Sequence, residues 1–142
     1  MAGNGATPTI CPTLRYRDAK AAVAFLKDAF GFTEVALYEG GDGVIHHAEL
    51  AYGNGMVMLG SAQNDSAFGR IAKDLGPVSV YVVVEDADAH HARAVAAGAE
   101  VVMPLSDQPY SSEEGVGSRD YSARDPEGNI WSFGTYRPRI PG

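Results

Sequence analysis

The chain has 142 residues and a formal net charge of −7 at pH 7, with 18 acidic and 11 basic side chains. This balance argues against nucleic acid or an anionic membrane as a partner, and no run approaches the roughly 18 consecutive apolar residues of a transmembrane helix. The one cysteine, Cys11, cannot form an internal disulfide, which favours a reducing, cytoplasmic compartment.

The residue pattern predicts two modules joined by a linker. The N-terminal segment is small and polar, and it lacks the basic and apolar regions of a signal peptide. The predicted parts are a flexible tail over 1–9, module 1 over 10–60, a linker over 61–77, module 2 over 78–136 and a C-terminal tail over 137–142.

In module 1 the pattern predicts a strand, a helix and three further strands, at 10–17, 19–29, 32–38, 44–51 and 56–60. Asp18 is a plausible N-cap for the helix. Gly31 follows the helix where a left-handed residue commonly ends one. A short amphipathic piece over 68–75 lies in the linker.

Module 2 repeats this order at 78–84, 87–97, 100–103, 118–124 and 130–136. The strand over 78–84 is nearly all β-branched, so we expect it to be central and well buried. Asp86 is expected to cap the second helix, and the segment 125–129 has Pro and Gly placed for a tight turn. The polar, glycine-rich segment 107–117 is predicted to be a mobile loop over a cavity mouth.

The two helices show that one pattern occurs twice. Asp18 and Asp86 are 68 positions apart, and Gly31 and Gly98 are 67 positions apart. Two βαβββ units in one chain usually pack sheet beside sheet, with a cavity between them. We therefore expect function on the inward faces of the strands.

Five segments carry a resemblance to a known family: Leu14-Arg15-Tyr16-Arg17-Asp18, Ala29-Phe30-Gly31-Phe32, His47-Ala48-Glu49-Leu50, Ala96-Ala97-Gly98-Ala99 and Asp125-Pro126-Glu127-Gly128-Asn129. Over about residues 10–136 the chain resembles the vicinal oxygen chelate superfamily, which includes glyoxalases and bleomycin-resistance proteins. The resemblance implies an α+β fold, in which two tandem βαβββ modules form curled mixed sheets around a cavity. It also implies a homodimer, because many members are dimeric.

Metal-dependent members of that family use His, Gln and Glu at four strand positions. By the resemblance these positions are Cys11, Met58, Ser79 and Ser132 in this chain. A divalent metal prefers imidazole and carboxylate ligands, so these residues do not predict a metal site. We expect no metal and no other cofactor.

Two histidine pairs are the remaining metal candidates, and neither has a chelating spacing. His46 and His47 are neighbours on a strand and point to opposite faces. By alternation we expect His46 to point inward with Ala48, and His47 outward. His90 and His91 lie early in a helix, where the solvent face is the favoured interpretation.

Strand alternation predicts the side chains that line the cavity. Tyr81, Asp120, Ser122 and Ser132 are expected to share one face, whereas Trp131 is expected to point toward the helix. Trp131 has two interpretations, core packing or a ring exposed for stacking. The predicted ligand-binding residues are Arg15, His46, Met56, Met58, Tyr81, Asp120, Ser122, Trp131 and Ser132.

Three functional hypotheses follow. The first is a metal-free, bleomycin-resistance-like protein that sequesters a small aromatic or cationic molecule such as an antibiotic. The second is a lyase, isomerase or dioxygenase of the glyoxalase class, with a divalent metal held by His46 or His47 together with Glu49. The third is a metal-free enzyme in which His46 and Asp120 transfer protons.

Overall fold

The computed structural model describes residues 6–63, 67–73, 76–109 and 117–141. The chain divides into two compact units, Met1–Gly76 and Pro77–Gly142, and the boundary falls inside the predicted linker. Each unit contains a four-stranded mixed sheet, as the α+β prediction requires. None of the described helices is long and apolar enough to cross a membrane.

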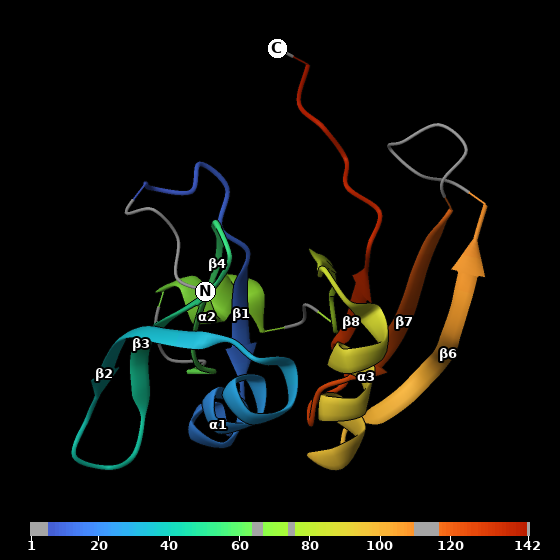
Figure 1. Cartoon of the computed structure of the whole chain (residues 1–142). Helices are drawn as coiled ribbons and strands as arrows, with labels where there is room; N and C mark the ends of the chain where they lie inside the picture. Colours follow the sequence, from blue (N-terminus) through green and yellow to red (C-terminus); the bar gives the residue numbers. More distant parts are fainter. Residues whose placement is uncertain (1–5, 64–66, 74–75, 110–116, 142) are drawn as a thin grey trace. The chain divides into compact units, whose positions relative to one another are not determined.

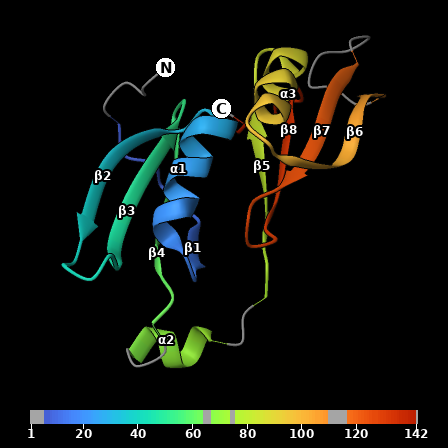
Figure 2. The same cartoon turned by 90° about the horizontal axis from the view of Figure 1, so that it is seen from below.

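Unit 1 has the strand order β1-β4-β3-β2, with β1 parallel to β4 and the other pairs antiparallel. Figure 2 shows its longer helix lying across one face of this sheet. Its elements are β1 (Thr13–Tyr16), α1 (Ala19–Phe30), β2 (Thr33–Glu39), β3 (Ile45–Tyr52), β4 (Gly55–Ser61) and α2 (Ala67–Ala72) (Figure 1).

Local signals set the ends of α1. The Asp18 carboxylate accepts a hydrogen bond of 3.1 Å from the backbone N–H of Ala21, which confirms the predicted cap. Gly31 ends the helix at φ 83°, a conformation that costs a side-chain-bearing residue energy. The buried side of α1 includes Leu26 and Phe30, both fully buried against the sheet. Burial of this apolar stripe holds the helix to the strands.

Unit 2 has the strand order β5-β8-β7-β6, with β5 parallel to β8. Its helix α3 is capped as predicted, because Asp86 accepts from the backbone N–H of Ala89. The elements are β5 (Ser79–Val83), α3 (Ala87–Ala96), β6 (Glu100–Gln108), β7 (Ser118–Arg124) and β8 (Ile130–Gly134).

The prediction that the β-branched strand is central and well buried is wrong. In its sheet β5 is an edge strand, beside β8. One of its faces is open enough that Tyr81 is 41% exposed, and Val78 just before the strand is 44% exposed. A run of β-branched residues indicates a strand, but its place in a sheet depends on partners distant in the sequence.

The turn between β7 and β8 is held by a buried carboxylate. Asp125 is 5% exposed and accepts hydrogen bonds from the backbone of Glu127 and Asn129, the Asn129 amide and the Trp131 indole. Gly128 takes φ 94°, as the predicted tight turn requires. The predicted mobile loop lies largely outside the described residues, since 110–116 are not described and β6 extends to Gln108.

Candidate functional site

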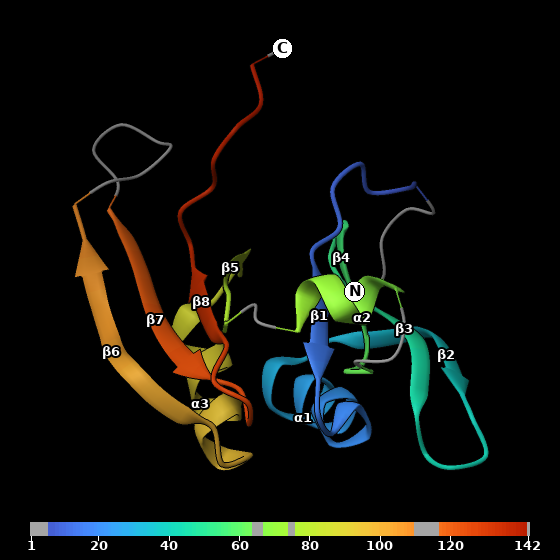
Figure 3. The ribbon, with the colours of Figure 1, turned by 180° about the vertical axis from the view of Figure 1, so that it is seen from behind.

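The open face of the unit 2 sheet brings together four of the predicted site residues. Ser132 on β8 pairs with Tyr81 on β5 and with Ser122 on β7, and Asp120 pairs with Gly134 one step along. Figure 3 shows this side of the sheet, with α3 behind the strands. The alternation predicted for this hairpin is therefore confirmed, because no register shift interrupts the pairing of β7 with β8.

Tyr81 is held in place by a glycine and a backbone carbonyl. A Cβ added at Gly134 would come within 2.7 Å of the Tyr81 hydroxyl oxygen and 2.8 Å of Asp120 Cβ, so the phenol ring lies over this glycine. The hydroxyl donates to the backbone oxygen of Tyr136 at 2.8 Å. The ring is thus anchored beside Asp120 while two fifths of the residue stays exposed.

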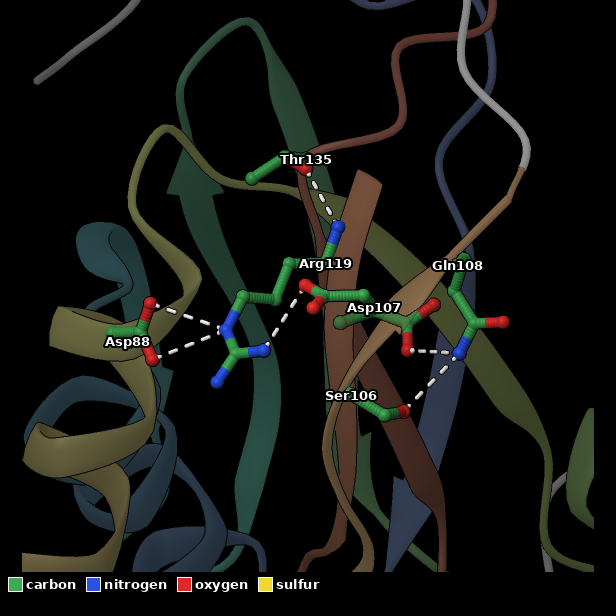
Figure 4. A network of polar contacts seen from close by, with 7 residues as sticks. Asp88, Ser106, Asp107, Gln108, Arg119 and Thr135 are labelled. Carbon is green, nitrogen blue, oxygen red and sulfur yellow. Dashed lines mark hydrogen bonds and ion pairs between the residues drawn. The ribbon is translucent and has the colours of Figure 1, made fainter. Parts of the chain in front are cut away.

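Polar groups continue across this face onto β6. Gln108 Nε2 donates to Asp120 Oδ1 and to Ser106 Oγ, both at 3.2 Å (Figure 4). The hydroxyls of Ser122 and Ser132 lie 2.7 Å apart. Sequence reasoning missed Ser106 and Gln108 because it ended the strand at residue 103. Their i, i+2 spacing was the signal that placed both on one face.

Arg119 lies between two carboxylates on the side of the sheet that α3 covers. Its guanidinium donates to Asp88 on α3 at 3.2 Å and to Asp107 on β6 at 3.1 Å (Figure 4). The hydrogen bonds that the guanidinium donates to Asp107, and then to Asp88, raise the pKa of Arg119 above its ordinary value. The Arg119 backbone N–H donates to Thr135 Oγ1 at 2.9 Å. These contacts link α3, β6 and β7 and make Arg119 a structural residue.

In unit 1 the predicted residues Arg15, Met56 and Met58 lie on the strands β1 and β4. Met56 and Met58 alternate with the buried Val57 and so lie on the face opposite the core. Arg15 donates to the backbone oxygen of Gln63 at 3.4 Å, and its guanidinium lies 5.9 Å from the centre of the Phe68 ring. This cation–π contact ties Arg15 to α2.

The predicted orientation of the first histidine pair is wrong. A register shift in the pairing of β2 with β3 leaves Ile45 and Ala48 both buried, three residues apart instead of two. Ala48 therefore faces the core without His46, which is exposed, with its Nε2 2.8 Å from where a Cβ on Gly40 would lie. His47 instead bonds through Nε2 to Glu49 at 2.9 Å.

Two other predictions concern the core of unit 2. Trp131 is fully buried and its indole donates to Asp125, which confirms core packing over an exposed stacking ring. His90, expected on the solvent face, is only 8% exposed and bonds through Nδ1 to the Tyr121 hydroxyl at 2.6 Å. It is buried because α3 turns this side chain onto β7 and β8, where its ring lies 4.1 Å from that of Phe133.

The residues at the family's metal positions do not suit a divalent metal. Cys11 contacts the backbone oxygen of Pro8 at 3.9 Å, Met58 offers a thioether, and the Ser132 hydroxyl is bonded to Ser122. Within the described ranges, no group of three His, Cys, Asp or Glu side chains is placed to hold a metal ion. A thioether and two hydroxyls are poor ligands for zinc, iron or manganese, and one cysteine does not make a metal site by itself.

Comparison with known proteins agrees with this architecture. The model of the Glyoxalase/Bleomycin resistance protein/Dioxygenase superfamily matches residues 10–133. The chain belongs to this superfamily. Uncharacterised proteins of Mycobacterium bovis and Mycobacterium tuberculosis are each 35% identical over 131 residues, which cover 89% of this chain and 82% and 74% of theirs.

Solved structures that are similar to this chain confirm the fold. TioX from Micromonospora sp. ML1 is 34% identical with a TM-score of 0.76, over 92% of this chain and 100% of TioX. A glyoxalase/bleomycin resistance protein/dioxygenase from Nocardioides is 23% identical with a TM-score of 0.63, over 96% of this chain and 91% of its own. The predicted family and its curled mixed sheets are thus confirmed.

Proposed function

We propose that this superfamily member binds a small, planar, cationic or aromatic molecule, such as an antibiotic, and sequesters it unchanged without a metal. The superfamily's name covers both resistance proteins and enzymes, so the choice between them rests on the site. The donor set at the metal positions supports a metal-free role. The open face of unit 2 supports binding of a flat ligand.

The observation that carries this proposal is that Tyr81 and Asp120 both lie beside Gly134 on the open face. An anchored, 41% exposed phenol ring offers a stacking platform, and a carboxylate beside it offers an acceptor for a ligand cation or N–H group. The adjoining hydroxyls of Ser122 and Ser132 add hydrogen-bonding groups of adaptable direction. A few polar groups placed to fix the orientation of a ligand are typical of a small-molecule site.

Charge favours the same class of ligand. The chain carries a net charge of −7, which raises the rate of encounter with cations. Gln108 donates to Asp120 and so orients its carboxylate on the open face. A ligand with a positive, planar group therefore fits the site better than an anion.

The test is calorimetric titration with acridine orange and with bleomycin, followed by mass spectrometry of the recovered ligand. We expect one of them to bind and to be recovered unchanged, and Tyr81→Ala and Asp120→Asn each to weaken binding by roughly 10-fold. Asp107→Asn is the matched control, because Asp107 lies on the neighbouring strand and faces Arg119 instead.

If Asp120→Asn and Asp107→Asn bind the ligand with equal affinity, the Asp120 carboxylate does not contribute to binding. A chemically altered ligand after incubation would replace sequestration by catalysis. Tryptophan fluorescence is a poor reporter here, because Trp131 is buried on the core side of β8 and does not reach the open face.

A further inference from the structure

The open face of the unit 1 sheet carries a histidine and a glutamate that the binding proposal does not use. His47 and Glu49 are two residues apart on β3 and share a face. The alternate residues Ala48 and Leu50 are fully buried on the α1 side. The side chains of His47 and Glu49 are 40% and 31% exposed, so both are accessible to a solute.

The hydrogen bond to Glu49 identifies which nitrogen of the imidazole is the donor. An ionised carboxylate only accepts, so the 2.9 Å contact means that His47 Nε2–H donates to Glu49 Oε2. In the neutral form of the ring, the lone pair then lies on Nδ1. Within the described residues, His47 has no other hydrogen bond, and its side chain is 40% exposed. The ring thus presents a proton-accepting nitrogen.

Neighbouring strands restrict the ring and supply an apolar surface. Tyr38, the register partner of His47 on β2, stacks on the imidazole with ring centroids 6.1 Å apart and planes at 29°. Met58 on β4 pairs with Glu49 on one side and with Thr13 on the other. An uncharged, partly aromatic substrate has apolar atoms to lie against beside the histidine.

We propose that His47 is a general base for hydrolysis of small activated esters, with Glu49 as its positioning residue. Nδ1 accepts a proton from water as the water oxygen bonds to the ester carbonyl carbon and the π electron pair of the carbonyl moves onto its oxygen. The π bond then re-forms as the bond from that carbon to the alcohol oxygen breaks, that bond's electron pair leaves with the alcohol oxygen, and Nδ1 releases its proton to solvent. Glu49 stabilises the imidazolium formed between these steps.

The proposal is tested with p-nitrophenyl acetate as the probe, by the absorbance of released p-nitrophenolate. His47→Gln is expected to lower kcat/KM at least about 10-fold, the scale of a lost general base. His46→Gln is the matched control, since this neighbouring histidine is exposed and outside the pair, and its effect should stay within about 2-fold.

Two variants of Glu49 test its role separately from that of His47. Glu49→Gln is expected to lower kcat with KM unchanged, and Glu49→Asp to restore more than half of the loss. A wild-type rate no higher than that of equimolar N-acetylhistidine amide would overturn the proposal, as would equal losses in His46→Gln and His47→Gln. If the Glu49→Gln variant hydrolyses the probe at the wild-type rate, Glu49 is not a positioning residue for His47. The hydrolysis and the calorimetric titrations are separate measurements on the wild-type protein, so failure of the binding proposal is distinguishable from failure of this one.

Discussion

Replacing Asp125 by alanine removes the acceptor of four hydrogen bonds in the turn between β7 and β8. Oδ1 accepts from the backbone of Glu127 at 2.9 Å and Asn129 at 3.1 Å, and Oδ2 accepts from the Asn129 amide at 2.9 Å and the Trp131 indole at 3.1 Å. Three of these donors belong to the buried residues Asn129 and Trp131.

The expected cost follows from those three buried donors. Each costs about 1–3 kcal/mol when left without a partner, and water entering the vacated space recovers part of this, so we expect a loss of about 3–5 kcal/mol. Asp125→Asn should cost about half as much, because it replaces one carboxylate oxygen by an amide that accepts nothing.

The assay is urea unfolding followed by circular dichroism and by the fluorescence of Trp131. Asp42→Ala is the matched control, because Asp42 also bonds a backbone N–H two residues on, at 3.1 Å, but in an exposed turn. It should cost about 1 kcal/mol or less. If the two alanine variants lose the same stability, the burial argument for Asp125 is refuted.

Three further outcomes are expected. Asp18→Ala should lose about 1 kcal/mol of unfolding free energy, because the helix cap is lost. Gly31→Ala should lose a similar amount, because alanine is strained in the left-handed conformation. Unchanged urea midpoints would contradict both expectations. Arg119→Ala should lower the melting temperature slightly at low salt and not at 1 M salt, because its pairs are exposed; a salt-independent loss would indicate a packing role. Native mass spectrometry after incubation with zinc, nickel, iron or manganese should give no stoichiometric metal, and one tightly held ion per chain would refute the fit argument at Cys11 and Met58.

Much of the candidate site in unit 2 followed from strand alternation. The face shared by Tyr81, Asp120, Ser122 and Ser132 was predictable because the β7–β8 turn carries a strong local signal and sets the register of both strands. Gln108 was missed because a polar strand at a sheet edge has no hydrophobic periodicity. The sequence left open whether His46 or His47 accompanies Glu49, and the register shift beside His46 leaves His47 on the same face as Glu49.

The sequence by itself determined the features that depend on a few neighbouring residues. The caps at Asp18 and Asp86, the glycine at the end of α1 and the Asp125 turn arise from short-range hydrogen bonds and allowed φ angles, which local chemistry dictates. Only the tertiary structure decided that β5 lies at an edge and that His90 is buried. Burial and strand order depend on which distant segments pack together, and no local pattern encodes that choice.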